Sequence, residues 1–121
     1  MDRLEDISRK IVAFRDRRAW SQFHTPGHLA AALSIEASEL QEALLWKSDE
    51  EISDFIRSKK GKRILLEEIA DVLIVALLFC HAMGIEPIEA IKTKLKLNAK
   101  KYPIHLSKGK ATKYTNLRRS R

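Results

Sequence analysis

Two apolar helical segments, each with a pair of acidic residues three positions apart, constrain this chain more than any other feature. The pairs are Glu36-x-x-Glu39, inside SIEASELQEALLW, and Glu68-x-x-Asp71, inside ILLEEIADVLIVALL. A three-residue step places both side chains of a pair on one face of a helix. Carboxylates are costly to bury unless they are paired or bind a cation, and neither segment contains a basic residue. The pattern predicts two helices that face each other across a cation site.

The chemistry of this site follows from its ligands. Side chains that offer only oxygen bind hard cations, and Mg²⁺ in enzymes usually acts on phosphate groups. Four carboxylates carry a charge of about −4, which two divalent ions would balance. The alternative is a solvent-facing role, which is open for the neighbouring Glu42 and Glu67 but is disfavoured for Asp71 by its apolar flanks.

Length and composition predict one intracellular domain. The chain has 121 residues and a single cysteine, so no internal disulfide can form. Its first ten residues, MDRLEDISRK, lack the apolar core of a secretion signal. No apolar run approaches the roughly 20 residues that a bilayer span requires. We therefore expect a cytoplasmic protein that is not bound to a membrane.

The charge is divided along the chain. Residues 1–91 contain 12 Lys and Arg against 16 Asp and Glu, whereas residues 92–121 contain 11 Lys and Arg and no acid. A basic segment attracts a nucleoside triphosphate or a nucleic acid equally well. We expect a domain over residues 1–108 and a basic tail over residues 109–121.

Helix signals predict an all-α fold, a bundle of four or five helices. Thr25 before Pro26 is typical of a helix start, Ser48 to Glu51 has the form of a capping box, and Gly84 is typical of a helix end. The segment from Lys59 to Lys62 is interpreted as a polar joint. The expected helices cover residues 4–18, 26–46, 48–57, 62–83 and 87–101.

The fourth expected helix also predicts an assembly. Between Ile69 and Cys80 only Asp71 is polar. A helix that is apolar on nearly every side is normally buried on every side. Since the other helices of one small chain can hardly surround it, we expect a homo-oligomer.

Aromatic and basic residues supply candidates for substrate binding. Trp20, Phe23, His24 and Trp46 could form a flat apolar pocket for a nucleobase, although a structural role is the commoner one for such residues. No second histidine has the spacing of a zinc ligand. Lysines near the end of the fifth helix could neutralise a triphosphate. The candidate residues in the basic C-terminal part of the chain are Asn98, Lys100, Lys101, Tyr102 and, further on, Lys113 and Tyr114.

Two classes of function are compatible with these residues. No serine or cysteine has a recognisable histidine partner, so hydrolysis would use metal-activated water. The alternative is a helical oligomeric module that binds nucleic acid or nucleotides without catalysis.

The chain resembles a known family over roughly residues 5–117. Glu-x-x-Glu followed by Glu-x-x-Asp on successive helices is the signature of the MazG-like all-α nucleoside triphosphate pyrophosphohydrolases. The dCTP pyrophosphatase branch of this family is the most similar. The resemblance to that branch lies in WSQFHTPGHLAAALSIEASELQEALLWKSD, LEEIADVLIVALL, NAKKYPIHL and KYTNL.

This resemblance implies a reaction and a set of site residues. Mg²⁺, with Mn²⁺ as an alternative ion, would be bound by Glu36, Glu39, Glu68 and Asp71, and water would attack the α-phosphorus to give a nucleoside monophosphate and pyrophosphate. The implied site is completed across the subunits of a dimer or tetramer. The base pocket is implied at Trp20, His24, Trp46 and Asn98, and the phosphate contacts at Lys101 and Tyr102. Nucleic acid is not an expected partner.

Three departures from the family pattern concern specificity more than chemistry. The segment between the two acidic helices, residues 47–63, varies among relatives and is more basic here around Lys59 to Arg63, and Gly27 and His28 stand where relatives often have larger polar residues. Glu86 stands where relatives often have a capping aspartate. The base preference, and whether Glu42 or Glu67 is the general base, stay open.

Overall fold

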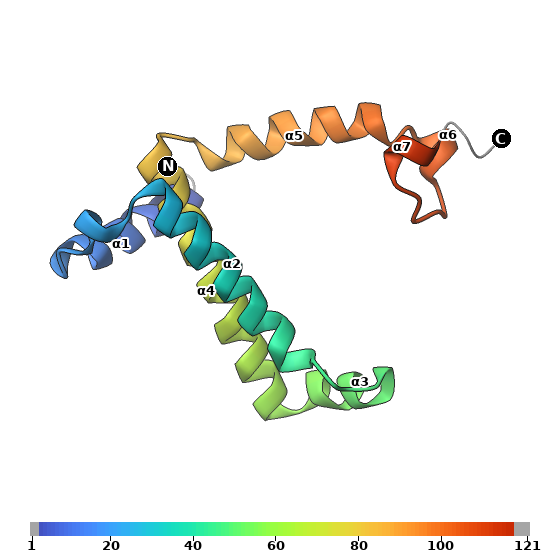
Figure 1. Cartoon of the computed structure of the whole chain (residues 1–121), viewed down its shortest axis with the longest axis horizontal. Helices are drawn as coiled ribbons and strands as arrows, with labels where there is room; N and C mark the ends of the chain where they lie inside the picture. The colour runs from blue at the N-terminus through green and yellow to red at the C-terminus, as the bar shows by residue number, and fades with distance from the viewer. Residues whose placement is uncertain (1–2, 118–121) are drawn as a thin grey trace. The chain divides into compact units, whose positions relative to one another are not determined.

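The chain folds entirely into helices in the part that the structure describes. The computed structural model describes residues 3–117, and every regular element among them is helical, which confirms the predicted fold class. The elements, labelled in Figure 1, are α1 (Arg3–Arg17), η1 (Trp20–Phe23), α2 (Pro26–Leu44), α3 (Asp49–Arg57), α4 (Lys59–Met83), α5 (Pro87–Lys101), α6 (Ile104–Ser107) and α7 (Tyr114–Leu117). No helix in this part has both the length and the apolar composition that a membrane span needs.

Three of the predicted capping groups lie at helix ends, as the sequence predicts. The Thr25 hydroxyl accepts a hydrogen bond from the His28 N–H at 3.3 Å, at the start of α2. Ser48 and Glu51 form the predicted capping box of α3. Gly84, the residue after α4, caps the end of that helix with a left-handed φ of 66°. Such caps depend on residues three or four apart, which is why the sequence alone reveals them.

The joint between α3 and α4 differs from the prediction. Residues 59–61 are the first turn of α4, so the predicted polar joint is wrong and a single residue, Ser58, separates the two helices. The Ser58 hydroxyl caps α4 by accepting a hydrogen bond from the Gly61 N–H at 2.9 Å. A Cβ on Gly61 would lie 1.7 Å from the Phe55 carbonyl oxygen. Glycine therefore permits this tight corner, because only a residue without a side chain fits against that carbonyl.

The chain divides into two compact units. The first unit ends at Ile85 and contains α1 to α4, and the second begins at Glu86 and contains α5 to α7. In the first unit, α2 and α4 lie side by side and antiparallel, while α1 and α3 each contact α4 (Figure 1). This antiparallel pair carries the two acidic motifs. The five longer helices are the predicted ones; α6, α7 and η1 are additional.

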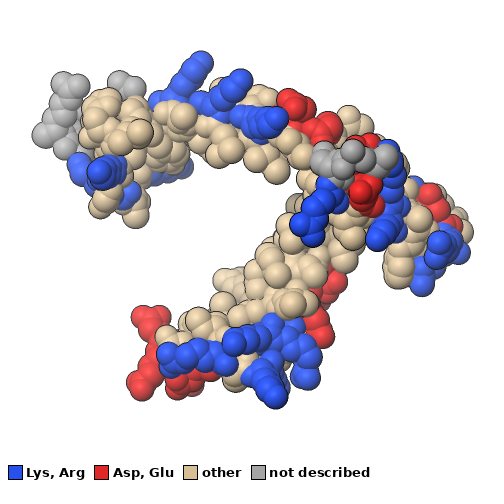
Figure 2. Space-filling model, turned by 180° about the vertical axis from the view of Figure 1, so that it is seen from behind, with Lys and Arg blue, Asp and Glu red and all other residues tan. Residues whose placement is uncertain are grey.

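The first unit has a thin hydrophobic core. Among its described residues, only Leu29 and Leu78 are buried apolar side chains. Apolar side chains of α4 are exposed instead, including Leu66 at 66% and Leu73 at 56%. Figure 2 shows a surface without charged side chains along part of the α2–α4 pair. One chain therefore leaves much of its apolar surface in contact with water.

The second unit consists of the long helix α5 followed by the two short helices α6 and α7. Glu86 caps α5 by accepting hydrogen bonds from the N–H groups of Ile88 and Glu89, so glutamate performs the capping role in place of the usual aspartate. Helix α7 lies within the expected basic tail, and its Leu117 is only 4% exposed. Residues 118–121 of that tail lie outside the described part.

Gly61→Ala should destabilise the chain by about 1–3 kcal/mol, the usual effect of overpacking, because the new methyl group must displace backbone at Phe55. Gly27→Ala is the matched control, since a Cβ there meets nothing within 4 Å and alanine favours a helix by up to about 1 kcal/mol. Urea unfolding at fixed protein concentration measures both. Equal stability of the two variants would show that the α3–α4 corner does not depend on Gly61.

Candidate metal centre

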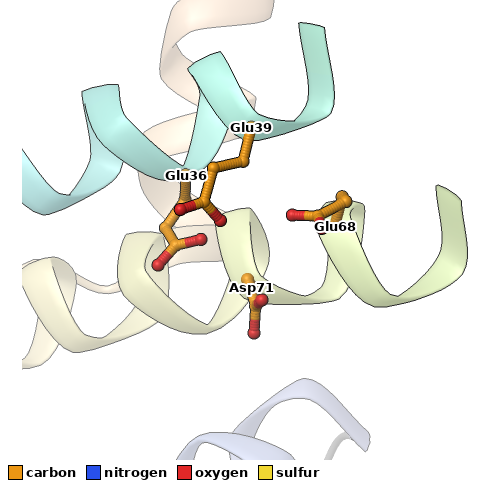
Figure 3. A group of neighbouring side chains, drawn as sticks. All are labelled: Glu36, Glu39, Glu68 and Asp71. Carbon is orange, nitrogen blue, oxygen red and sulfur yellow. The ribbon is translucent and has the colours of Figure 1, made fainter. Parts of the chain in front are cut away.

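Four carboxylates converge between α2 and α4. Glu36 and Glu39 come from one turn of α2, and Glu68 and Asp71 come from one turn of α4. One oxygen from each residue lies within 4.8 Å of the corresponding oxygens of the other three (Figure 3). Each i, i+3 step puts its pair on one helix face, and the antiparallel packing turns the two faces toward each other. We call these four residues the carboxylate cluster.

The carboxylate cluster is electrostatically unbalanced without a cation. In residues 3–117, no Lys, Arg or His forms an ion pair with any of the four side chains. One oxygen of Glu36 and one of Glu68 are buried without a hydrogen-bond partner in the described part of the chain. A buried carboxylate oxygen without a donor is unfavourable. A bound cation would remove this cost.

The close approach of the four carboxylates and their burial raise the pKa of two of them, Glu36 and Glu68. Burial is the first cause that raises the pKa of Glu36 above its ordinary value of 4.5, followed by a hydrogen bond with Glu39 and by the neighbouring negative charges. Burial also comes first in raising the pKa of Glu68, followed by the charges of Glu39 and Asp71. A divalent cation would relieve the same repulsion at neutral pH. All four ligands are carboxylates, the donors that Mg²⁺ and similar hard ions prefer.

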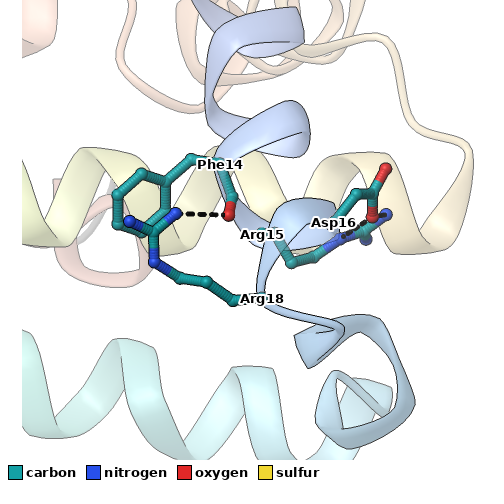
Figure 4. Close-up of polar contacts among 4 residues, drawn as sticks. All are labelled: Phe14, Arg15, Asp16 and Arg18. Atoms are coloured by element: carbon teal, nitrogen blue, oxygen red, sulfur yellow. Dashed lines mark hydrogen bonds and ion pairs between the residues drawn. The ribbon is translucent and has the colours of Figure 1, made fainter.

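Trp20 is held by a cluster of side chains at the end of α1. Its ring meets the Phe14 ring edge to face, with centroids 5.9 Å apart. The Arg18 guanidinium lies 3.5 Å from the Phe14 centroid and 5.8 Å from the Trp20 centroid. Arg18 also donates a hydrogen bond to the Phe14 carbonyl (Figure 4). Sequence reasoning did not identify Phe14 and Arg18 as supports of the expected pocket, although their i, i+4 spacing just before Trp20 was a usable signal.

His24 lies immediately after η1 with one ring nitrogen buried. Its Nδ1 has no hydrogen-bond partner among residues 3–117. Burial, and then the positive charge of Arg15, lower the pKa of His24 below 6.5. Arg15 is itself nearly buried, with 11% of its side chain exposed, and donates through Nε and Nη2 to one Asp16 oxygen (Figure 4). Burial therefore favours the neutral form of His24.

Trp46 lies far from Trp20 within one chain. Trp20 precedes α2 and Trp46 follows it, and a 19-residue helix is about 28 Å long. Trp46 is 91% exposed and has a left-handed φ of 62°, an unusual conformation for a bulky residue. A single chain does not bring the two predicted pocket tryptophans together.

The remaining candidates belong to the second unit. Asn98, Lys101 and Tyr102 lie in or just after the last turn of α5, and the Tyr102 N–H donates to the Asn98 carbonyl at 2.8 Å. Their spacing of three and four residues places them on neighbouring parts of one helix face. Asn98 and Lys101 are half-buried, whereas Tyr102 is exposed.

Comparison with known proteins places the chain among pyrophosphatases. The MazG-like family model matches residues 31–117. The chain is 40% identical over 114 residues to dCTP pyrophosphatase 1 of Bos taurus and 37% identical over 114 residues to dCTP pyrophosphatase 1 of Homo sapiens. Each alignment covers 94% of this chain, with 68% of the bovine and 67% of the human protein.

A solved structure has a similar fold. The crystal structure of a pyrophosphatase from Archaeoglobus fulgidus DSM 4304 matches with a TM-score of 0.77 and 41% sequence identity. The match covers 85% of this chain and 94% of that one. Together with the curated relatives, it confirms the resemblance found in the sequence.

Magnesium should stabilise the folded chain more strongly as the pH rises. Glu36 and Glu68 have raised pKa values in the folded chain, so their protonation stabilises the metal-free fold below pH 4.5, and this contribution is lost as the pH rises through the folded pKa. A divalent ion binds the ionised cluster. Added Mg²⁺ should raise the unfolding temperature little at pH 4.5 but by about 5 °C or more at pH 8. Differential scanning fluorimetry measures this.

Glu68→Gln tests whether the cluster is responsible. This variant should unfold at a higher temperature than the parent at pH 8 without metal, because it removes a repelling charge, and should respond little to Mg²⁺. Glu67→Gln changes the neighbouring residue in the same way and should keep the response. An equal Mg²⁺ effect on the parent and on Glu68→Gln would contradict the site.

Proposed function

The chain belongs to the MazG-like family, and from this we propose that it hydrolyses dCTP or a related pyrimidine deoxynucleoside triphosphate in a Mg²⁺-dependent reaction. The products are the nucleoside monophosphate and pyrophosphate. The observation that carries the proposal is the carboxylate cluster, with four acidic side chains within 4.8 Å of one another and no basic partner among the described residues. The proposed role is the removal of unwanted nucleotides from the cytoplasmic pool.

The cluster fits a resident metal. Glu36, Glu39, Glu68 and Asp71 would hold two Mg²⁺ ions, with Mn²⁺ as an alternative. Bound Mg²⁺ neutralises phosphate charge and lowers the pKa of water. The packing of α2 on α4 brings the carboxylates together before the substrate arrives, which limits the reorganisation that binding requires.

Hydrolysis at the α-phosphorus requires no protein nucleophile. The oxygen of a water molecule forms a bond to the α-phosphorus. The bond from the α-phosphorus to the oxygen that bridges it to the β-phosphorus breaks, and pyrophosphate leaves with that oxygen. The water proton passes to a carboxylate acting as general base. Glu42 and Glu67 are the two candidates outside the cluster, and both are exposed on the helices that carry it.

Recognition of the base is proposed to involve Trp20, His24, Trp46 and Asn98. The neutral form of His24 can exchange a hydrogen bond with a base edge, and the tryptophans can stack on the ring. Because Trp20 and Trp46 lie at opposite ends of α2, we propose that a second subunit supplies one of them. Lys101 and Tyr102 are proposed to contact the phosphates. Figure 2 shows that basic side chains line part of α5, which favours a polyanionic substrate.

A homo-oligomer, dimer or tetramer, explains the thin core. The exposed apolar residues of α4 would lose contact with water at a subunit interface. Permanent interfaces of this kind resemble a domain core that is divided between subunits. The highly exposed Trp46 would then be available to a partner's site.

Turnover tests the site directly. Glu39→Gln and Asp71→Asn should retain helical circular dichroism but lose about 100-fold or more in kcat, the scale expected for the loss of one preorganised electrostatic group. Glu50→Gln, on the exposed surface of α3, is the control and should leave turnover unchanged. Pyrophosphate release from dCTP measures all three variants. Full Mg²⁺-dependent activity of Asp71→Asn would contradict the site.

A nucleotide panel tests the substrate and the class of function. The panel contains dCTP, its 5-modified forms, dUTP, dATP and the ribonucleotides. A purine preference would contradict the assignment to dCTP but would leave the chemistry intact. Turnover only of a dinucleotide or a damaged nucleotide would keep the metal site and change the pocket assignment. Failure with every nucleotide, together with salt-sensitive binding of DNA or RNA, would favour the non-catalytic module.

Light scattering after size exclusion should give two or four times the mass of one chain. Leu73→Glu should reduce the assembled mass or prevent folding, because it places a charge in the exposed apolar face of α4. Lys60→Glu, at the exposed start of the same helix, should assemble normally. A monomeric parent chain with full activity would refute a shared site.

A further inference from the structure

The segment after α5 returns to the end of that helix. The N–H groups of Ser107 and Lys108 donate to the carbonyls of Pro103 and Ile104 at 2.9 and 3.0 Å, which forms α6. Gly109 then takes a left-handed φ of 76°. Leu117, the last residue of α7, is buried within the second unit. This return places Tyr114 against the last residues of α5.

The Tyr114 ring contacts both residues that are proposed to bind the phosphates. Its edge-to-face contact with Tyr102 has a centroid separation of 6.0 Å and an interplanar angle of 78°. The Lys101 Nζ lies 4.7 Å from the centroid of the Tyr114 ring. One aromatic side chain therefore restrains two neighbouring residues.

We propose that Tyr114 is a positioning residue, which holds Lys101 and Tyr102 in the arrangement that receives the substrate's phosphates. This inference rests on the proposed function. It assigns a role to residues 109–117, which the sequence suggests only as part of a basic tail. Tyr114 acts through its two neighbours and need not contact the nucleotide itself.

The physical basis is the freedom of the lysine side chain. A free lysine loses rotamer entropy when it binds a phosphate. The face of an aromatic ring attracts an ammonium group and limits the positions it samples, so Lys101 loses less freedom on binding. The ammonium keeps hydrogen-bond donors for phosphate, because a ring face occupies only one side of it. Neither ring contact requires the Tyr114 hydroxyl.

The experiment measures kcat and KM for Mg²⁺-dCTP with the full chain, two substitutions and one truncation. Tyr114→Leu should raise KM about three- to tenfold, the scale of losing one aromatic and one cation–ring contact. Its kcat should change less than twofold. Tyr114→Phe keeps the ring and should match the parent. Truncation after Lys108 should raise KM at least as much as Tyr114→Leu.

A double variant tests whether Tyr114 acts through Lys101. In a Lys101→Met background, Tyr114→Leu should raise KM much less than in the parent, because the shared interaction is already absent. An equal increase in KM from Tyr114→Leu in both backgrounds would overturn the proposed link between Tyr114 and Lys101. Unchanged KM for Tyr114→Leu, or an equal loss in Tyr114→Phe, would overturn the role of the ring.

Calorimetric titration with inorganic tripolyphosphate and Mg²⁺ separates this inference from the proposed reaction. Tyr114→Leu should weaken binding by the same factor as it raises KM, whether or not the chain turns over dCTP. An inactive parent that still shows this difference would refute the reaction and keep the positioning role. A parent that binds no tripolyphosphate, or binds it no better than Tyr114→Leu, would refute the positioning role.

Discussion

The mutual repulsion of four carboxylates, held together by the packing of α2 on α4, is the constraint on which the rest of this structure depends. Helix packing forces Glu36, Glu39, Glu68 and Asp71 together, and no basic residue in the described part compensates them. Burial and repulsion raise the pKa of Glu36 and Glu68. The metal-free fold therefore contains an unfavourable electrostatic interaction, which the proposed binding of a hard cation would relieve.

The proposed assembly would explain both the weak core and the separated aromatic residues. A chain that buries only Leu29 and Leu78 as apolar residues in its first described unit obtains little hydrophobic stabilisation by itself. The same chain presents Trp46 to solvent in a left-handed conformation. A second subunit would supply the missing apolar contacts and the missing pocket wall at once. Stability and substrate binding would then depend on the same interface.

Local signals made much of the fold predictable. The caps at Thr25, Ser48 and Gly84 act within a few residues, so the sequence identified the helix ends they define. The α3–α4 joint was missed because the approach of Gly61 to the Phe55 carbonyl is set by how two helices meet. Phe14 and Arg18 were missed as supports of Trp20 for a similar reason, since their contacts with the Trp20 ring form only when the chain turns into η1.

The sequence by itself determined the helices, the family and the two acidic pairs, because each of these depends on residue types at short spacing. Only the tertiary structure decided that the two pairs meet within 4.8 Å, that Trp20 and Trp46 lie apart in one chain, and that Tyr114 touches Lys101 and Tyr102. These facts depend on how helices pack and where the chain turns back. That packing alone sets the distances between residues that are far apart in the sequence.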